Sequence, residues 1–215
     1  MEGTARPGPT CLLLGAVGGG KSLLARRLRH IRGAGGPGGA GVPGGPCPHP
    51  LPSRHRVLNS AAQLSAEEGT SELGEPPATL PTVGTNLTDL RLPRKVTVRE
   101  LGGCMGPIWP SYYSECSALL FVVDAANPTQ VSSSCVQLLS ILSAEQLASV
   151  PVLVIFNKID LPCYMSLVEM KSLFRMQDII SCATQPITML ETSARDGTGL
   201  ADVLQWLRAT LGDPR

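Results

Sequence analysis

The sequence predicts an α/β fold in which a mostly parallel, six-stranded sheet carries helices on both faces. Short apolar runs, which are typical of buried parallel strands, alternate along the chain with segments of helical periodicity. In addition, residues 15–22 (GAVGGGKS) match G-x-x-x-x-G-K-[ST] between an expected strand and an expected helix. That order is the one in which a phosphate-binding loop occurs.

The loop contains the residue types that phosphate binding needs. Glycines allow successive backbone N–H groups to turn inward around phosphate oxygens, and the N-terminus of the next helix adds partial positive charge. We expect Lys21 to reach the β- and γ-phosphates and the Ser22 hydroxyl to bind Mg²⁺. A glycine-rich turn without a ligand is the alternative. The residues expected at the phosphates are Gly15, Val17, Gly18, Gly19, Gly20, Lys21 and Ser22.

The other elements follow from periodicity and turn residues. Strands are expected at 10–14, 87–92, 95–101, 118–124, 152–156 and 187–191, the second and third forming an antiparallel hairpin. Helices are expected from the phosphate loop to about residue 32, over 128–148, from Ser166 towards Cys182, and over 199–211. Residues 102–116 are expected to form a loop.

The domain is expected to span residues 10–211, after a disordered lead-in over 1–9 and before a short tail over 212–215. Residues 33–77 interrupt it. Their first part, 33–50, holds 8 Gly and 5 Pro in 18 residues, a composition that cannot build a packed core. We interpret 33–77 as a flexible insertion in a surface loop; a gene-model artefact is the alternative.

Composition limits the partners. A net charge of +1 provides no basic field, so we do not expect nucleic acid to bind. No apolar run approaches the ~20 residues of a membrane helix, and the first residues resemble neither a signal peptide nor a myristoylation site. We therefore expect a cytoplasmic protein without a direct membrane anchor. The seven cysteines include no C-x-x-C pair, and we expect most of them to be buried apolar residues.

The tetrapeptide Asn-Lys-Ile-Asp, directly after an expected buried strand, identifies the base. The Asp160 carboxylate could accept both guanine N1–H and its exocyclic amine, whereas adenine has no such donor pair. We expect Asn157 to tie this loop to the phosphate loop and the Lys158 stem to cover one face of the base. Ser193 and Ala194 are expected where a backbone N–H could donate to guanine O6. A chance N-K-x-D turn is the alternative.

Together these motifs resemble those of small GTPases, which have the small G domain of the P-loop NTPase fold. The sequence P-T-V-G-x-N from residue 81 resembles the first switch of the ADP-ribosylation factor (Arf) family. The sequence P-I-W from residue 107, followed by Tyr112 and Tyr113, resembles that family's second switch. The resemblance covers residues 10–32 and about 79–211.

The resemblance implies a GTP-binding switch that takes GTP or GDP with Mg²⁺. Thr82 is then the first-switch ligand of Mg²⁺ that senses the γ-phosphate, Gly103 donates its backbone N–H to that phosphate, and Glu100 contacts the metal through water. Loss of the γ-phosphate would release both switches. The implied partners are protein effectors and exchange or activating proteins, in intracellular or ciliary trafficking, with recruitment to Golgi or ciliary membranes through partners.

Three residues depart from the family pattern. Cys104 stands at the position of the water-orienting glutamine, and a thiol is a short, weak hydrogen-bonding group, so hydrolysis should slow on the order of 10²–10³-fold. Glu100 stands at a position where an aspartate is usual, and the glutamate side chain is longer by one methylene. Val17 borders the catalytic position, as harmless packing or as an inhibitor. We predict a switch with weak hydrolysis. The alternatives are a GTPase completed by a partner's catalytic group, a scaffold that binds no nucleotide, and a nucleoside kinase.

Overall fold

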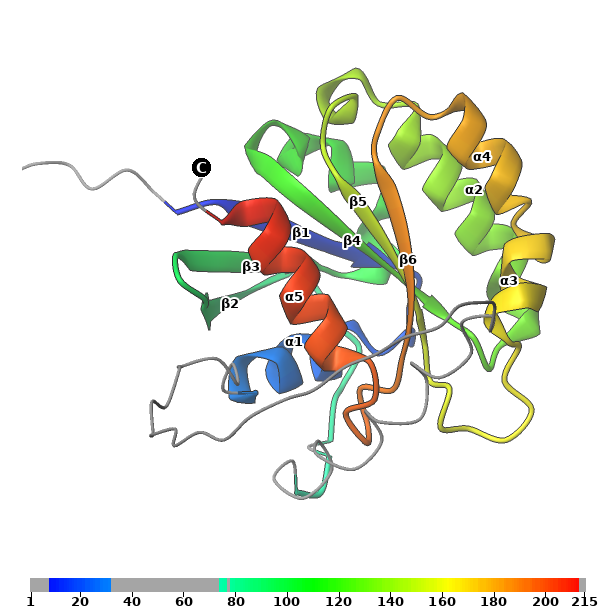
Figure 1. Ribbon diagram of the computed structural model, residues 1–215, viewed down its shortest axis with the longest axis horizontal. Coiled ribbons are helices and arrows are strands. Elements are labelled where there is room, and N and C mark those ends of the chain that lie inside the picture. Colours follow the sequence, from blue (N-terminus) through cyan, green and yellow to red (C-terminus); the bar gives the residue numbers. More distant parts are fainter. Residues whose placement is uncertain (1–7, 32–73, 77, 213–215) are drawn as a thin grey trace, which may run out of the picture.

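A computed structural model describes residues 8–31, 74–76 and 78–212. It contains a six-stranded sheet in the order β2-β3-β1-β4-β5-β6, with helices on both faces (Figure 1). Strand β2 runs antiparallel to β3, and every other neighbouring pair is parallel. The predicted fold class is therefore confirmed. The strands are β1 (Thr10–Gly15), β2 (Thr85–Arg91), β3 (Lys95–Leu101), β4 (Cys116–Asp124), β5 (Val152–Asn157) and β6 (Ile187–Thr192).

Helices α1 and α5 cover one face of the sheet, and α2, α3 and α4 cover the other (Figure 1). The α-helices are α1 (Lys21–His30), α2 (Val131–Leu142), α3 (Leu167–Leu173), α4 (Met176–Cys182) and α5 (Leu200–Leu211). The short 3₁₀ elements are η1 (Gly103–Glu115), η2 (Pro128–Gln130) and η3 (Glu145–Leu147). Each face of the sheet therefore has its own apolar core.

The central strand β1 supplies both cores. Leu12 and Leu14 belong to the core under α2 to α4, while Cys11 and Leu13 belong to the core under α1 and α5. All four side chains are fully buried. Because successive side chains of a strand point to opposite faces, a continuous apolar run is what a strand covered on both sides requires.

Two predicted helices are interrupted. The helix expected over 128–148 is divided into η2, α2 and η3, because the chain turns to an extended conformation at Ala144 and buries Leu147 in the core. The helix expected from Ser166 to Cys182 breaks at Arg175, whose φ is 51°. Its neighbours Phe174 and Met176 are both buried. In a continuous helix, residues two apart point roughly 200° from each other, so both could not face one core.

Three further expectations need correction or lie outside the described residues. The expected loop at 102–116 is η1, a 3₁₀ helix with a kink at Met105. Among the six cysteines described, only Cys11 is buried, so the expectation that most are buried is wrong. The lead-in, the insertion and the tail lie almost entirely outside the described residues. Within those residues, no helix is long and apolar enough to cross a membrane.

Candidate nucleotide site

The candidate site lies where β1, β3, β5 and β6 end, at the carboxyl edge of the parallel sheet. This edge is where open α/β sheets bind ligands. Two hollows meet there, one of about 430 Å³ beside the phosphate loop and one of about 260 Å³ beside Asp160. Gly20, Leu23 and Lys158 line both hollows, so the two form one elongated site.

The phosphate loop presents a buried ammonium group. The Nζ of Lys21 donates to the carbonyls of Gly15 at 2.9 Å and of Ala16 at 2.8 Å, and the side chain is 5% exposed. Burial lowers the pKa of Lys21, an effect that the nearby Glu100 and Cys104 oppose. An ammonium has three donors, so these two bonds leave one donor for an anion in the hollow.

Three oxygen-bearing side chains from separate parts of the chain meet beside Lys21. The hydroxyls of Ser22 and Thr82 lie 3.0 Å apart, and both donate to Oε1 of Glu100, from Thr82 at 3.0 Å. The other carboxylate oxygen accepts from Asn86 at 3.3 Å. Hydroxyl and carboxylate oxygens are ligands that Mg²⁺ prefers, so the predicted metal set is brought together and its chemistry fits that ion.

The two switch segments are linked beside the phosphate loop. The backbone N–H of Gly102 donates to the carbonyl of Gly84 at 3.0 Å. A Cβ on Gly103 would lie 2.4 Å from the backbone nitrogen of Val17, so only glycine fits this close approach. The backbone of Gly103 therefore borders the hollow that Lys21 faces.

Asn157 joins three loops of the site. Its Nδ2 donates to the carbonyl of Gly19 at 2.9 Å, which is the predicted tie to the phosphate loop. Its Oδ1 accepts from the backbone N–H of Ala194 at 3.0 Å and from the hydroxyl of Thr192 at 3.1 Å. The side chain is 1% exposed. Asn157 therefore fixes the loops that follow β5 and β6 against the phosphate loop.

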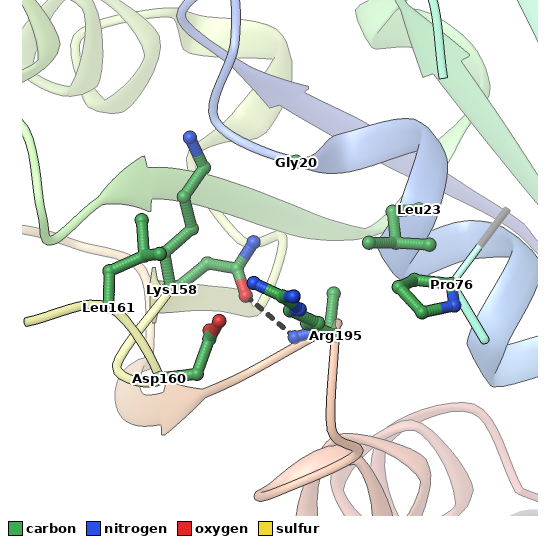
Figure 2. Close-up of a pocket in the computed structure, with 9 residues that line it drawn as sticks. Gly20, Leu23, Pro76, Lys158, Asp160, Leu161 and Arg195 are labelled. Atoms are coloured by element: carbon green, nitrogen blue, oxygen red, sulfur yellow. Dashed lines mark hydrogen bonds between the residues drawn. The ribbon is translucent and has the colours of Figure 1, made fainter. Parts of the chain in front are cut away.

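Asp160 lies on the wall of the smaller hollow, across from Leu23 and Pro76 (Figure 2). Its Oδ1 accepts from the Ser193 hydroxyl at 2.7 Å. This bond leaves the second carboxylate oxygen available, and it orients the group towards the hollow. Ala194 and Arg195 also line the hollow. Four of the five residues predicted to contact guanine therefore line one cavity, and the fifth, Ser193, is fully buried and bonds to Asp160.

Three residues that contact or line the site are not identified by the sequence reasoning. Asp124 forms an ion pair with Lys158, with Oδ2 and Nζ 2.6 Å apart, and is 7% exposed. The sequence did contain a signal for Asp124, because a charged residue there ends an apolar strand at this edge of the sheet. Gln130 donates from Nε2 to the carbonyl of Val17 at 3.2 Å. No sequence signal pointed to Gln130 or to Pro76.

The departures from the family pattern lie together. Val17, 43% exposed, and the exposed Cys104 both line the larger hollow. Neither has an amide or carboxylate that could hold a water molecule. Among the described residues, this part of the hollow is open to solvent.

Comparison with known proteins decides the family. A model described as the ADP-ribosylation factor family matches residues 70–211. ADP-ribosylation factor-like protein 16 of Homo sapiens is 56% identical over 210 residues, which cover 98% of this chain and 89% of that protein. The chain belongs to the ADP-ribosylation factor family. ADP-ribosylation factor-like protein 1 of Drosophila melanogaster is 32% identical over 143 residues, which cover 65% of this chain and 78% of that protein.

A solved Arf-like structure has the same fold. The Arl6 BBS3 small GTPase of Trypanosoma brucei, solved with the bound nucleotide analogue GppNp, matches with a TM-score of 0.67 and 18% identity. The match covers 95% of this chain and 98% of that one. Membership of the Arf family, together with this fold, supports a GTP-binding switch.

Proposed function

We propose that this Arf-family protein is a switch that binds GTP or GDP with Mg²⁺ and hydrolyses GTP slowly. One observation carries the proposal. The hydroxyls of Ser22 and Thr82 and the carboxylate of Glu100 converge beside the buried ammonium of Lys21, while a thiol, Cys104, stands at the glutamine position. This arrangement supports binding and disfavours turnover.

The phosphates would bind in the larger hollow. Lys21 and the backbone N–H groups of the phosphate loop would contact the β- and γ-phosphates, and Gly103 would donate its N–H to the γ-phosphate. Ser22 and Thr82 would ligate Mg²⁺ directly, and Glu100 would act through water. When Mg²⁺ is bound, it neutralises phosphate charge. The hydroxyl bonds to Glu100 would then be replaced by bonds to the metal shell.

Guanine would bind in the smaller hollow. The Asp160 carboxylate would accept the N1–H and the exocyclic amine. The backbone N–H of Ala194 already donates to Asn157, so the N–H of its neighbour Arg195, which also lines the hollow, would face O6. The Lys158 stem would cover one face of the ring, while its ammonium stays paired with Asp124. A base without the paired donors would leave the carboxylate unsatisfied, which costs about 1–3 kcal/mol or more for a charged group.

Slow hydrolysis follows from the side chains around the γ-phosphate position. The thiol of Cys104 cannot both accept from the attacking water and donate to the transition-state oxygens. A second candidate is a GTPase completed by a partner. The exposure of Val17 and Cys104 favours it, because a partner's arginine or glutamine could enter the hollow there. A scaffold that binds no nucleotide would have no use for the buried Lys21.

The switch would signal through apolar side chains beside it. Leu80 is 87% exposed, Val83 is 90% exposed and Ile108 is 46% exposed. These residues lie in or beside the two switches, which the Gly102–Gly84 hydrogen bond links. Loss of the γ-phosphate would free Thr82 and rearrange this surface, so effectors would distinguish the two states. By family analogy we propose effectors in intracellular or ciliary trafficking, met in the cytoplasm and recruited to Golgi or ciliary membranes through partners.

The test is the nucleotide content of the purified full-length chain, followed by titration with labelled GTP and GDP with and without Mg²⁺. We expect tight binding that weakens when Mg²⁺ is chelated, and bound GTP that survives purification. A chain with no affinity for guanine nucleotide would refute the proposal. Rapid single-turnover hydrolysis without a partner would refute slow hydrolysis but not nucleotide binding.

A further inference from the structure

A segment that leads into the first switch, and includes its first two residues, forms one wall of the whole site. We name residues 74–76 and 78–82 the strap. Pro76 lines the smaller hollow, and Thr79, Leu80, Pro81 and Thr82 line the larger one. The strap therefore extends from the base end of the site to the metal end.

A buried arginine of α1 anchors the strap to the loop that follows β6. The Nη2 of Arg27 donates to the carbonyl of Gly74 at 2.9 Å and to the carbonyl of Arg195 at 3.1 Å, and the side chain is 3% exposed. A second bond runs from Nη1 of Arg26 to the carbonyl of Ala78 at 3.2 Å. A guanidinium is buried in this way only where hydrogen bonds compensate its lost hydration, so the anchoring contact is a specific one.

The anchored strap gives the base pocket its second apolar side. Figure 2 shows Leu23 and Pro76 on one side of the hollow and Lys158, Asp160 and Leu161 on the other. A planar base needs apolar contact on its ring as well as hydrogen bonds at its edge. Without Pro76, only Leu23 would cover the ring on the side of α1.

We propose that the strap closes the nucleobase pocket, and that Pro76, held in place through Arg27, controls how fast guanine nucleotide dissociates. Pro76 is the residue that contacts the nucleotide, and Arg27 is a positioning residue. The inference rests on the proposed function, because the strap can retain a nucleotide only if the pocket binds guanine. It goes further by assigning a binding role to Pro76, which lies outside all of the nucleotide motifs.

The test measures dissociation of a fluorescent GDP from the full-length chain during a chase with excess unlabelled GDP. We expect Pro76→Gly to speed dissociation about tenfold, the change expected from removing an apolar contact of about 1.4 kcal/mol. Arg27→Ala should have an effect at least as large, and Arg27→Lys should restore part of it because it retains the charge without the paired donors. Arg29→Ala, an exposed position on the same helix, is the matched control.

A double variant separates positioning from general destabilisation. If Arg27 acts through Pro76, then Pro76→Gly added to Arg27→Ala should change the dissociation rate by less than about twofold. Multiplicative effects would overturn the coupling. A rate within about twofold of wild type in Pro76→Gly would overturn the strap itself, even if Arg27→Ala fails to fold. If the wild-type chain binds no guanine nucleotide, the proposed function fails first, and this inference fails with it.

Discussion

Replacing Asn157 by alanine removes the side chain on which the three loops of the site converge. Its amide makes three hydrogen bonds, with Gly19, Thr192 and Ala194, and all three partners are buried. An alanine leaves a carbonyl, a hydroxyl and an N–H without these partners. The substitution therefore tests whether the loops are held by this residue or by the strands from which they extend.

The magnitude follows from these three groups. Leaving a buried polar group unsatisfied costs about 1–3 kcal/mol. Water can enter the space of the lost side chain and compensate part of the cost, so we expect the lower half of the range. The expected loss is about 3–6 kcal/mol in the free energy of unfolding. Since domains are stable by about 5–15 kcal/mol, the variant should be marginally folded at 37 °C.

Urea unfolding of the nucleotide-free chain, followed by circular dichroism, measures this loss. Ser134→Ala is the matched control, because Ser134 is 1% exposed and its hydroxyl has no hydrogen-bond partner among the described residues. Removing that hydroxyl should leave the stability unchanged or raise it by up to about 1 kcal/mol. A loss below about 1 kcal/mol in Asn157→Ala, or a comparable loss in both variants, would refute the reasoning.

Three further predictions concern single residues. Cys104→Gln should raise single-turnover GTP hydrolysis on the order of 10²-fold, because it restores a donor and an acceptor for the attacking water; an unchanged rate would mean that the barrier lies elsewhere. In alkylation at about pH 8, the exposed Cys104 should react well before Cys116. Burial raises the pKa of Cys116 to about 11, so its thiolate fraction is very small at that pH. GTP analogues with Mg²⁺ should slow only the Cys104 reaction. Mass spectrometry of the two cysteine-containing peptides measures both rates, and faster alkylation of Cys116 than of Cys104 would contradict the prediction. Ser166→Ala should destabilise α3 by about 1 kcal/mol, because the Ser166 hydroxyl accepts from the backbone N–H of Glu169 at the N-cap. Ser181→Ala, whose exposed hydroxyl contacts only Asp178 and Cys182, should be nearly neutral, and thermal melts of the two variants measure the difference.

The sequence by itself determined the parts of the site that are continuous in the chain. A phosphate loop between a strand and a helix is recognisable because glycine, lysine and serine each act within a few residues of the helix start. The same holds for Asn157 and Asp160, whose spacing alone places both at one strand end. The pattern of apolar residues likewise predicted the six strands, most clearly β1, β4 and β5, because burial on both faces requires an uninterrupted apolar run.

Only the tertiary structure decided what lies far apart in the chain. Ser22 meets Thr82 and Glu100 across sequence separations of 60 and 78 residues, which strand order alone brings together. The left-handed Arg175 breaks a helix that periodicity predicted as continuous, because its two neighbours must both enter the core. Pro76 reaches the base pocket through a bond between Arg27 and Gly74 that no local pattern encodes. Contacts of this kind depend on packing, and packing is a property of the whole fold.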